Sequence, residues 1–514
     1  MRPRCIRLPR LVDPRIVRAM TTRALSCLAL SLTLLACEST PTSPSSPPTR
    51  GRPVVIDGLF NEWDRGPGRA SVVLADADYL YVRLGVEGED LSLQSGRETF
   101  SIWIDADDDP RTGRRVGRPA PAATLGTDLE IRFSPAQGGR ITPGASVVVY
   151  AADGTPSNVS PYAIGLVAAP THSSSWFEVR ISRHLDGVPG LPDRGLLSSG
   201  SLAGLHVLSN ERSEPVGWSE APFSVNLPPR APAPPLADIR LPATHPDAIR
   251  IVSFNVLRSA PAVKRREFAH LFQILDPDIV LLQEWDAPPE EIQSWFAVLM
   301  GDPRATWHVR KGDAWGVAIA SRHPIEPLGP DRLAPPGEDA SAPPVRFIAG
   351  IVRTPLGEVG VASVHLKCCG SAGSDEDRRR LAEAQAVRDA LAEAFSESAT
   401  SMRVVGGDLN LVGSRDPLLR LARTLDADGT DLTPVSAPLL GDATHITWSD
   451  PASPFPPGRL DWLLVGDARA SIVNSFVLDT ARLTDAALAR MGLDRGDSSA
   501  SDHRPVVVDL RPAR

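Results

Sequence analysis

Apolar residues recur along the chain in two different patterns, which predict two folded modules. Between residues 53 and 226, short apolar or alternating runs such as Tyr79–Val86 and Thr99–Ile104 are separated by clusters of Gly, Pro and Asp. A long helical period is absent from this part of the sequence. The pattern is typical of an all-β sandwich, in which short strands alternate with tight turns.

From residue 248 to residue 514, strand-like and helix-like patterns alternate. The apolar segments Arg250–Asn255 and Ile279–Leu282 predict strands, and the apolar residues between them repeat with the period of a helix. Further along, Ser374 followed by Asp377 resembles a capping box that opens a helix, and the strand-like segment Met402–Val405 comes next. Strands mixed with helices in this way predict a layered α/β domain.

Two segments rich in proline, residues 38–52 and 227–247, predict linkers before and between these modules. Residues 1–37 predict a signal peptide, because Arg23 precedes an apolar run that is too short to cross a membrane. The run ends in Leu-Leu-Ala-Cys at Cys37, which resembles a bacterial lipobox. The resemblance implies cleavage before Cys37 and lipidation of this residue.

The expected location is therefore outside the cytoplasm, with a lipid anchor on a bacterial membrane, facing the periplasm or the cell surface. Ordinary secretion with an unmodified Cys37 is the alternative. The residues before Met20 are rich in arginine and unlike a signal peptide, so both Met1 and Met20 are candidate starts.

Composition narrows the function classes. The net charge of −8 gives no general basic excess, which disfavours a protein that wraps long duplex nucleic acid. Of the five cysteines, only Cys368 and Cys369 lie in the predicted modules. Adjacent cysteines form only a strained disulfide, and two of them without further ligands make a poor zinc site, so the sequence predicts neither a disulfide framework nor structural zinc.

Six short polar motifs follow apolar strands in the second module, where open sheets usually place their chemistry. Each motif alone is weak, since Gly, Asp and Asn are also common turn residues. In chain order they are Ser253-Phe254-Asn255, Gln283-Glu284, Val364-His365-Leu366, Gly407-Asp408-Leu409-Asn410, Arg459-Leu460-Asp461-Trp462 and Ser501-Asp502-His503-Arg504-Pro505.

Together and in this order, the motifs resemble those of the endonuclease/exonuclease/phosphatase superfamily. The motifs at residues 407–410 and 501–505 are the most specific part, and the resemblance covers residues 248–514. It implies a catalytic domain of DNase-like type: a four-layer α/β (α+β) sandwich of two mostly antiparallel sheets covered by helices. The site is expected where the loops of the two sheets meet.

Hydrolysis of a phosphate ester needs a cation beside the phosphoryl oxygens, an activated water and a group facing the leaving oxygen. Mg²⁺ prefers carboxylate oxygen and keeps several waters, so one or two protein carboxylates suffice. The resemblance implies Glu284 as the principal ligand of Mg²⁺, or of Mn²⁺ in its place, with Asn255 and Asp502 as neighbours.

The remaining motif residues suit the catalytic roles. Asp408 suits orienting or deprotonating the attacking water, and Asn410 suits donating an amide hydrogen to a phosphoryl oxygen. His503 is a candidate hydrogen-bond or proton donor, and Asp461 matches the position of the carboxylate that fixes its tautomer. His365 matches a position near the leaving oxygen, where a general acid would act.

Three positions leave alternatives open. Apurinic endonucleases often have an acidic residue where this chain has Leu257, which puts a DNA-repair version of the metal shell in doubt. Lys367 is a candidate phosphate contact or a solvated surface lysine. Trp448 is a candidate substrate contact or a packed core tryptophan.

The first module resembles, more loosely, family 9 carbohydrate-binding modules, through Ile56-Asp57-Gly58, Glu62-Trp63 and the segment Asp76–Tyr81. This resemblance implies polysaccharide as a candidate partner. Asp105, Asp107 and Asp109 are spaced like alternating ligands of Ca²⁺. Pro110 stands where an EF-hand loop would need glycine, so a solvated acidic turn is an equal reading.

The expected function is a metal-dependent hydrolase of phosphate esters, a phosphodiesterase with nuclease as the first choice. A sphingomyelinase-like phospholipase or a phosphomonoesterase is the alternative within the same chemistry. An inactive surface protein that binds polysaccharide is the alternative of another class. The substrate is accordingly a nucleic acid, a phospholipid or a small phosphodiester, and the protein is expected to be a monomer.

Overall fold

A computed structural model describes residues 54–63, 71–86, 91–117, 120–191, 195–198, 200–219, 222–230, 236–301, 306–335, 337, 343–397 and 402–513. All of them belong to one compact unit, residues 52–514. The predicted signal peptide, Cys37 and the first linker lie outside the described residues. No helix in the described ranges is long and apolar enough to cross a membrane.

The first module is built from antiparallel strands, and the described part adds one short 3-10 helix, η1 (Ala120–Thr124). One sheet has the order β1-β2-β10-β9, and the other has the order β12-β11-β3-β4-β7-β8, with β13 also paired to β11. The strands are β1 (Val72–Ala75), β2 (Tyr79–Gly85), β3 (Thr99–Asp105), β4 (Leu129–Phe133), β5 (Ala136–Gln137), β6 (Arg140–Ile141), β7 (Ala145–Tyr150), β8 (Pro156–Val159), β9 (Val167–Ala169), β10 (Trp176–Ser182), β11 (Gly200–Ser209), β12 (Pro215–Trp218) and β13 (Phe223–Leu227).

Alternation explains how these two sheets enclose a core. In β2, Leu80, Val82 and Leu84 are buried in the same apolar cluster as Ile102 and Ile104 of β3. Successive side chains of a strand point to opposite faces, so every second residue of β2 and β3 enters the space between the sheets.

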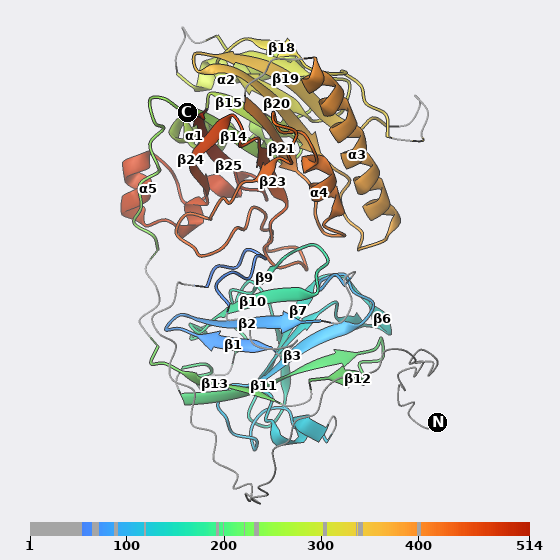
Figure 1. Ribbon diagram of the computed structural model, residues 1–514. Helices are drawn as coiled ribbons and strands as arrows, with labels where there is room; N and C mark the ends of the chain where they lie inside the picture. The colour runs from blue at the N-terminus through green and yellow to red at the C-terminus, as the bar shows by residue number, and fades with distance from the viewer. Residues whose placement is uncertain are drawn as a thin grey trace, which may run out of the picture. The chain divides into compact units, whose positions relative to one another are not determined.

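The second module contains two six-stranded sheets (Figure 1), with the orders β16-β17-β15-β14-β25-β24 and β18-β19-β20-β21-β23-β22. Most neighbours are antiparallel, but β14–β15 and β20–β21 are parallel. The strands are β14 (Ile249–Asn255), β15 (Ile279–Gln283), β16 (His308–Lys311), β17 (Ala318–Ser321), β18 (Ile325–Pro327), β19 (Arg346–Thr354), β20 (Gly357–His365), β21 (Met402–Asp408), β22 (Thr433–Pro434), β23 (Asp461–Val465), β24 (Ala470–Val477) and β25 (Val506–Pro512).

Helices pack against these sheets through separate apolar clusters. One cluster joins Phe268 and Phe272 of the first helix to Val252 and Val280 of the first sheet. A second joins the long helix α3 to the other sheet, beside which α3 and α4 lie in Figure 1. The helices are α1 (Arg265–Leu275), α2 (Pro289–Leu299), α3 (Asp375–Ser396), α4 (Asp416–Ala422) and α5 (Asp485–Met491), with the 3-10 turns η2 (Ala260–Ala262), η3 (Thr480–Arg482) and η4 (Asp497–Ala500).

The predicted start of α3 is confirmed. Ser374 precedes the helix in an extended conformation, and its hydroxyl accepts a hydrogen bond from the N–H of Asp377 at 3.2 Å. This bond satisfies one of the N–H groups that the first turn of a helix leaves without a partner.

The two modules share a core. Ile56, Trp63 and Val167 of the first module belong to the same buried apolar cluster as residues from both sheets of the second, such as Ile251 and Val361. The indole of Trp63 donates to the carboxylate of Glu178 at 2.9 Å, so this tryptophan is a core residue and offers no exposed platform for a sugar.

An ion pair also joins the modules. Arg180 donates to both carboxylate oxygens of Asp442, at 2.5 and 2.9 Å, and both side chains are buried. The described second half of the proline-rich segment lies on the second module, where the Ala237 N–H donates to the carbonyl of Arg482 and Ile239 packs on the core beside α1.

Candidate active site

Strand register places three of the predicted catalytic residues side by side. His365 ends β20 and Asp408 ends β21, and the two residues are partners in the parallel pairing of these strands. Asp461 begins β23 and is the antiparallel partner of Asp408. Neighbouring strands lie about 4.8 Å apart, so residues far apart in the sequence form one row.

The facing sheet supplies the next two residues. Asn255 ends β14, and Glu284 directly follows β15, which pairs with β14 in parallel. The side-chain amide of Asn255 is buried and donates to Oε1 of Glu284 at 3.2 Å and to Oδ2 of Asp408 at 3.1 Å. One amide therefore links carboxylates from both sheets.

The Gly-Asp-Leu-Asn motif fixes the direction of Asp408. Gly407 has a φ of +148°, and a Cβ atom there would lie 1.8 Å from the carbonyl oxygen of Val364, so a larger residue does not fit. Asn410 has a φ of +48°, its N–H donates to Oδ1 of Asp408 at 3.0 Å, and its side chain donates to the carbonyl of Leu366 at 3.1 Å. Asn tolerates this left-handed conformation better than most residues.

Asp408 is buried, and its second oxygen, Oδ2, lies 3.4 Å from Nε2 of His365 and 3.7 Å from Nε2 of His503. Burial raises the pKa of Asp408 to about 7, because the surroundings penalise the charged form more strongly than His503 favours it. A carboxyl with this pKa can exchange a proton with a water near neutral pH.

His503 is held by Asp461, whose Oδ2 atom lies 2.8 Å from Nδ1 of the ring. Burial alone would lower the pKa of His503, but the charges of Asp461 and Asp408 outweigh it and raise the pKa to about 10. The ring is therefore a cation at neutral pH, and the hydrogen bond at Nδ1 leaves Nε2 to face the cluster.

His365 has the opposite character. Burial, together with the charges of Arg346 and His503, lowers its pKa well below the usual value. Its Nδ1 atom is buried and has no hydrogen-bond partner among the described residues. At neutral pH the ring is uncharged, so it can donate a hydrogen bond from one nitrogen and accept or coordinate at the other.

Asp502 lies beside Trp448, whose indole donates to Oδ2 of Asp502 at 3.0 Å. The other oxygen, Oδ1, is buried and has no protein partner in the described ranges. The candidate substrate contact Trp448 is thus engaged through its N–H with a predicted metal neighbour. The Asp502 carbonyl also accepts from the N–H of Ser449 at 2.8 Å.

Lys367 and the two cysteines follow His365 in the loop after β20. The backbone N–H of Lys367 donates to Glu383 at 2.7 Å, and its side chain is only partly buried. The sulfur atoms of Cys368 and Cys369 lie 2.8 Å apart as free thiols.

Thr447 is a functional candidate that the sequence analysis missed. Its hydroxyl accepts hydrogen bonds from the N–H groups of Leu460 and Asp461, both at 3.0 Å, and its carbonyl accepts from the N–H of Arg504 at 2.7 Å. It ties the segments on either side of the His503–Asp461 pair. No sequence signal marks it, since a threonine before Trp448 belongs to none of the six motifs.

The donor set fits a hard divalent cation. Asp408 and Asp461 are buried, and Glu284 is partly exposed. Among the described contacts, His503 is the one cationic side chain beside Asp408 and Asp461. The cluster thus carries excess negative charge where burial already raises the pKa of Asp408. Carboxylate and amide oxygens are the ligands that Mg²⁺ and Mn²⁺ accept. The structure brings ligand atoms of Asp408, Asp461 and His503 within 4.8 Å of one another. That Glu284, Asn255 and Asp502 would hold the ion stays a prediction from the sequence.

The predicted calcium residues are brought together only in part. Asp105 and Asp107 lie close together, but the carboxylate of Asp109 is paired with Arg111 through two hydrogen bonds of 2.8 Å. The third carboxylate of the cluster is Asp128, which is fully buried. The calcium role of Asp109 stays a prediction, and in the structure Arg111 competes for both of its carboxylate oxygens.

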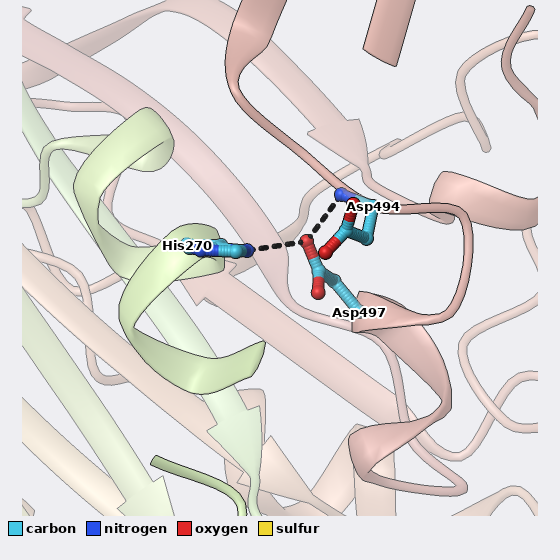
Figure 2. Close-up of side chains that lie close together, drawn as sticks. All are labelled: His270, Asp494 and Asp497. Atoms are coloured by element: carbon cyan, nitrogen blue, oxygen red, sulfur yellow. Dashed lines mark hydrogen bonds and ion pairs between the residues drawn. The ribbon is translucent and has the colours of Figure 1, made fainter. Parts of the chain in front are cut away.

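A third cluster joins His270 of α1 to Asp494 and Asp497 (Figure 2). The ring of His270 lies 3.0 Å from Oδ2 of Asp497, which also accepts from the N–H of Asp494 at 2.7 Å. Arg266 pairs with the carboxylate of Asp494. These contacts connect η4 to α1. They also pair the carboxylates of the cluster, which leaves little negative charge to bind a metal.

Part of the chain matches a known protein family. Residues 252–503 match the model of the Endonuclease/Exonuclease/phosphatase family. A search of curated proteins gave no match.

Solved structures of low sequence identity match about half of this chain. They include humanized D. rerio TDP2 (15% identity, 52% of this chain and 99% of that chain, TM-score 0.35) and the 3' phosphatase NExo from Neisseria bound to product DNA hairpin (19%, 51% and 98%, 0.34). Sphingomyelinase C from Streptomyces griseocarneus is another (16%, 51% and 99%, 0.32). The family match over residues 252–503 supports a phosphoesterase domain in this part of the chain.

Proposed function

We propose that this protein is a Mg²⁺- or Mn²⁺-dependent phosphodiesterase that acts outside the cytoplasm, with nucleic acid as the first candidate substrate. The observation that carries the proposal is the position of Asp408. Its Oδ2 atom is approached by Asn255, His365 and His503, which come from separate motifs.

In the proposed reaction, Asp408 receives a proton from the attacking water, since its pKa of about 7 lies near the working pH. Asn410 fixes Oδ1 of Asp408 through its backbone N–H, which leaves Oδ2 to face the water. A bound divalent cation would neutralise charge on the phosphoryl oxygens.

His503 and His365 take different roles. His503, charged and held by Asp461, donates a hydrogen bond to a phosphoryl oxygen that gains charge in the transition state. His365 is uncharged, so a hydrogen bond from its ring to the leaving oxygen suits it better than transfer of a stored proton. This refines the general-acid role that the sequence predicts for His365.

The test uses the chain from residue 38 onward, which keeps the whole compact unit 52–514. Hydrolysis is measured with and without Mg²⁺ on single- and double-stranded DNA, RNA, sphingomyelin, an artificial phosphodiester and an artificial phosphomonoester. Asp408→Asn keeps the shape of the side chain and removes the proton acceptor. The exposed Asp247→Asn is the matched control.

Turnover that needs both Mg²⁺ and Asp408 supports the proposal, and loss of a general base costs at least about a hundredfold in rate. A preference for sphingomyelin or for the monoester would select the phospholipase or phosphomonoesterase instead. No turnover on any substrate, with the protein folded, would contradict the proposal and favour a protein that only binds polysaccharide.

We also propose the domain organisation and the lipid anchor that the sequence predicts. Residues 248–514 form a four-layer catalytic domain after a carbohydrate-binding-like β-sandwich at residues 53–226, and Cys37 carries a lipid that anchors a monomer to a bacterial membrane. Support comes from the paired sheets and their helix-facing clusters, and from the lipobox-like sequence. Labelling with a lipid precursor, lost in Cys37→Ser, tests the anchor.

A further inference from the structure

Two loops at the candidate active site are bonded to the first module. One follows Asn410, at residues 411–414, and the other is the hairpin at residues 447–459, which precedes Asp461. Backbone bonds between Trp448 and Gly458, at 2.9 and 3.0 Å, close the base of this hairpin.

Tyr162 of the first module fills the turn of the hairpin. Its hydroxyl accepts a hydrogen bond from the N–H of Asp450 and donates one to the carbonyl of Phe455, both at 3.0 Å. Burial raises the pKa of Tyr162, so the hydroxyl keeps the proton that it donates. Polar backbone groups withdrawn from water need partners, and here a side chain of the other module supplies them.

Thr171 lies between both loops. Its hydroxyl is 2.7 Å from the carbonyl oxygen of Leu411, directly after Asn410, and 3.2 Å from that of Arg459, two residues before Asp461. Its methyl group packs so closely on Gly458 that a Cβ atom there would lie 2.5 Å away. Nearby, the N–H of Ser173 donates to the carbonyl of Gly413 at 2.7 Å.

The hairpin also bonds to Asp502, the proposed metal ligand, so its contacts with the first module affect this residue. Trp448, two residues before Asp450, donates to Oδ2 of Asp502, and Ser449 donates to the Asp502 carbonyl. Three successive residues therefore link the first module to Asp502. A displacement of the hairpin would change the direction in which the free oxygen of Asp502 points.

We infer that the first module is part of the catalytic apparatus, and that Tyr162 and Thr171 are positioning residues for hydrolysis. They hold the hairpin and the loop after Asn410 in the arrangement that aims Asp502, Asp461 and Asn410 into the site. The expected effect on the rate rests on the proposed function. The contacts of Tyr162 and Thr171 with the two loops do not depend on that function.

The test compares Tyr162→Phe and Thr171→Val, which remove single hydroxyl groups and keep the shape of each side chain. Tyr81→Phe is the matched control, since its hydroxyl bonds to Asp76 within the first module. We expect kcat/KM to fall about tenfold in each test variant, because small displacements of catalytic groups cost up to about a hundredfold. The concentration of Mg²⁺ for half-maximal rate should rise, and the control should match the wild type.

Hydrogen exchange gives a readout besides activity. In Tyr162→Phe the amide of Asp450 and its neighbours in residues 447–459 should exchange faster, while the strands of the first module keep their protection. If both variants lower the melting temperature but leave kcat, KM, the Mg²⁺ dependence and the exchange of the hairpin unchanged, the inference is wrong. If the wild type itself hydrolyses nothing, the proposed function fails, and the exchange measurement still decides whether the first module braces the hairpin.

Discussion

The Nδ1 atom of His503 lies 2.8 Å from Oδ2 of Asp461, and both side chains are buried. The charge of Asp461 is a principal reason why the pKa of His503 is raised to about 10. This pair has consequences for the dependence of the rate on pH.

Asp461→Asn should lower kcat at least about a hundredfold, because the neutral amide no longer favours the charged ring. The folded-state pKa of His503 lies above its ordinary value, so the cation is present below that pKa and is lost as the pH rises through it. In the variant this loss should move to lower pH, so that residual activity falls at a lower pH than in the wild type. Rates measured from pH 5 to pH 10 check this. An unchanged alkaline limb would show that the His503 cation is not required.

Gly407→Ala should destabilise the fold severely, because its Cβ would lie 1.8 Å from the Val364 carbonyl between two paired strands. We expect a loss of more than about 4 kcal/mol in the free energy of unfolding, or no folded protein. The control is Gly429→Ala, where φ is +85° and the space is open. Its cost should be about 1–2 kcal/mol, from the left-handed backbone alone. Urea unfolding measures both, and equal costs would exclude the proposed clash.

Arg250 and Asp509 form a buried, two-pronged ion pair at 2.7 and 2.8 Å. Asp509→Ala leaves the guanidinium buried without its counterion, which should cost about 3–5 kcal/mol in the free energy of unfolding. The matched control, Glu326→Ala, removes one of the two carboxylate partners of exposed Arg353 and should change stability little. A small effect of Asp509→Ala would mean that water reaches Arg250.

His206 should make the fold sensitive to acid. Burial between Phe100 and Phe223 lowers its pKa to about 3, against 6.5 for the free side chain. Between about pH 3 and pH 6.5, His206 therefore binds a proton in the unfolded chain but not in the folded chain. Stability falls through this window by about 1.4 kcal/mol for each pH unit. His206→Asn should reduce the slope by about 1.4 kcal/mol for each pH unit, as measured by urea unfolding between pH 4 and pH 7. His245→Asn, at an exposed position, should leave the slope as in the wild type.

The sequence predicted the strand ends of the second module well, because a polar residue after an apolar run is a local signal. Asn255, His365 and Asp408 end strands as expected, and Ser374 caps α3. The convergence of these residues depends on register and could be inferred only from the resemblance. The pairing of His365 with Asp408 joins strands that are separated by the whole of α3.

Other features escaped prediction because they depend on distant partners. Asp128 lies with Asp105 and Asp107, since the pairing of β3 with β4 brings it near Asp105. The bond from Trp448 to Asp502 and the bonds from Tyr162 to the hairpin span 54 and nearly 300 residues, and no local pattern reports them. The shared core was also unforeseen, because an apolar residue such as Ile56 does not reveal which module covers it.

The position of β25 sets an order of events during synthesis. Its residues Val506–Leu510 lie between β14 and β24, inside the sheet that holds Asn255. Until the ribosome has added these residues, one edge of β14 lacks its backbone hydrogen-bond partners and Arg250 lacks its counterion Asp509. A nascent chain can thus form most of the helices and the first module's strands long before its catalytic centre is complete. Activity is expected to appear only once β25 has joined this sheet.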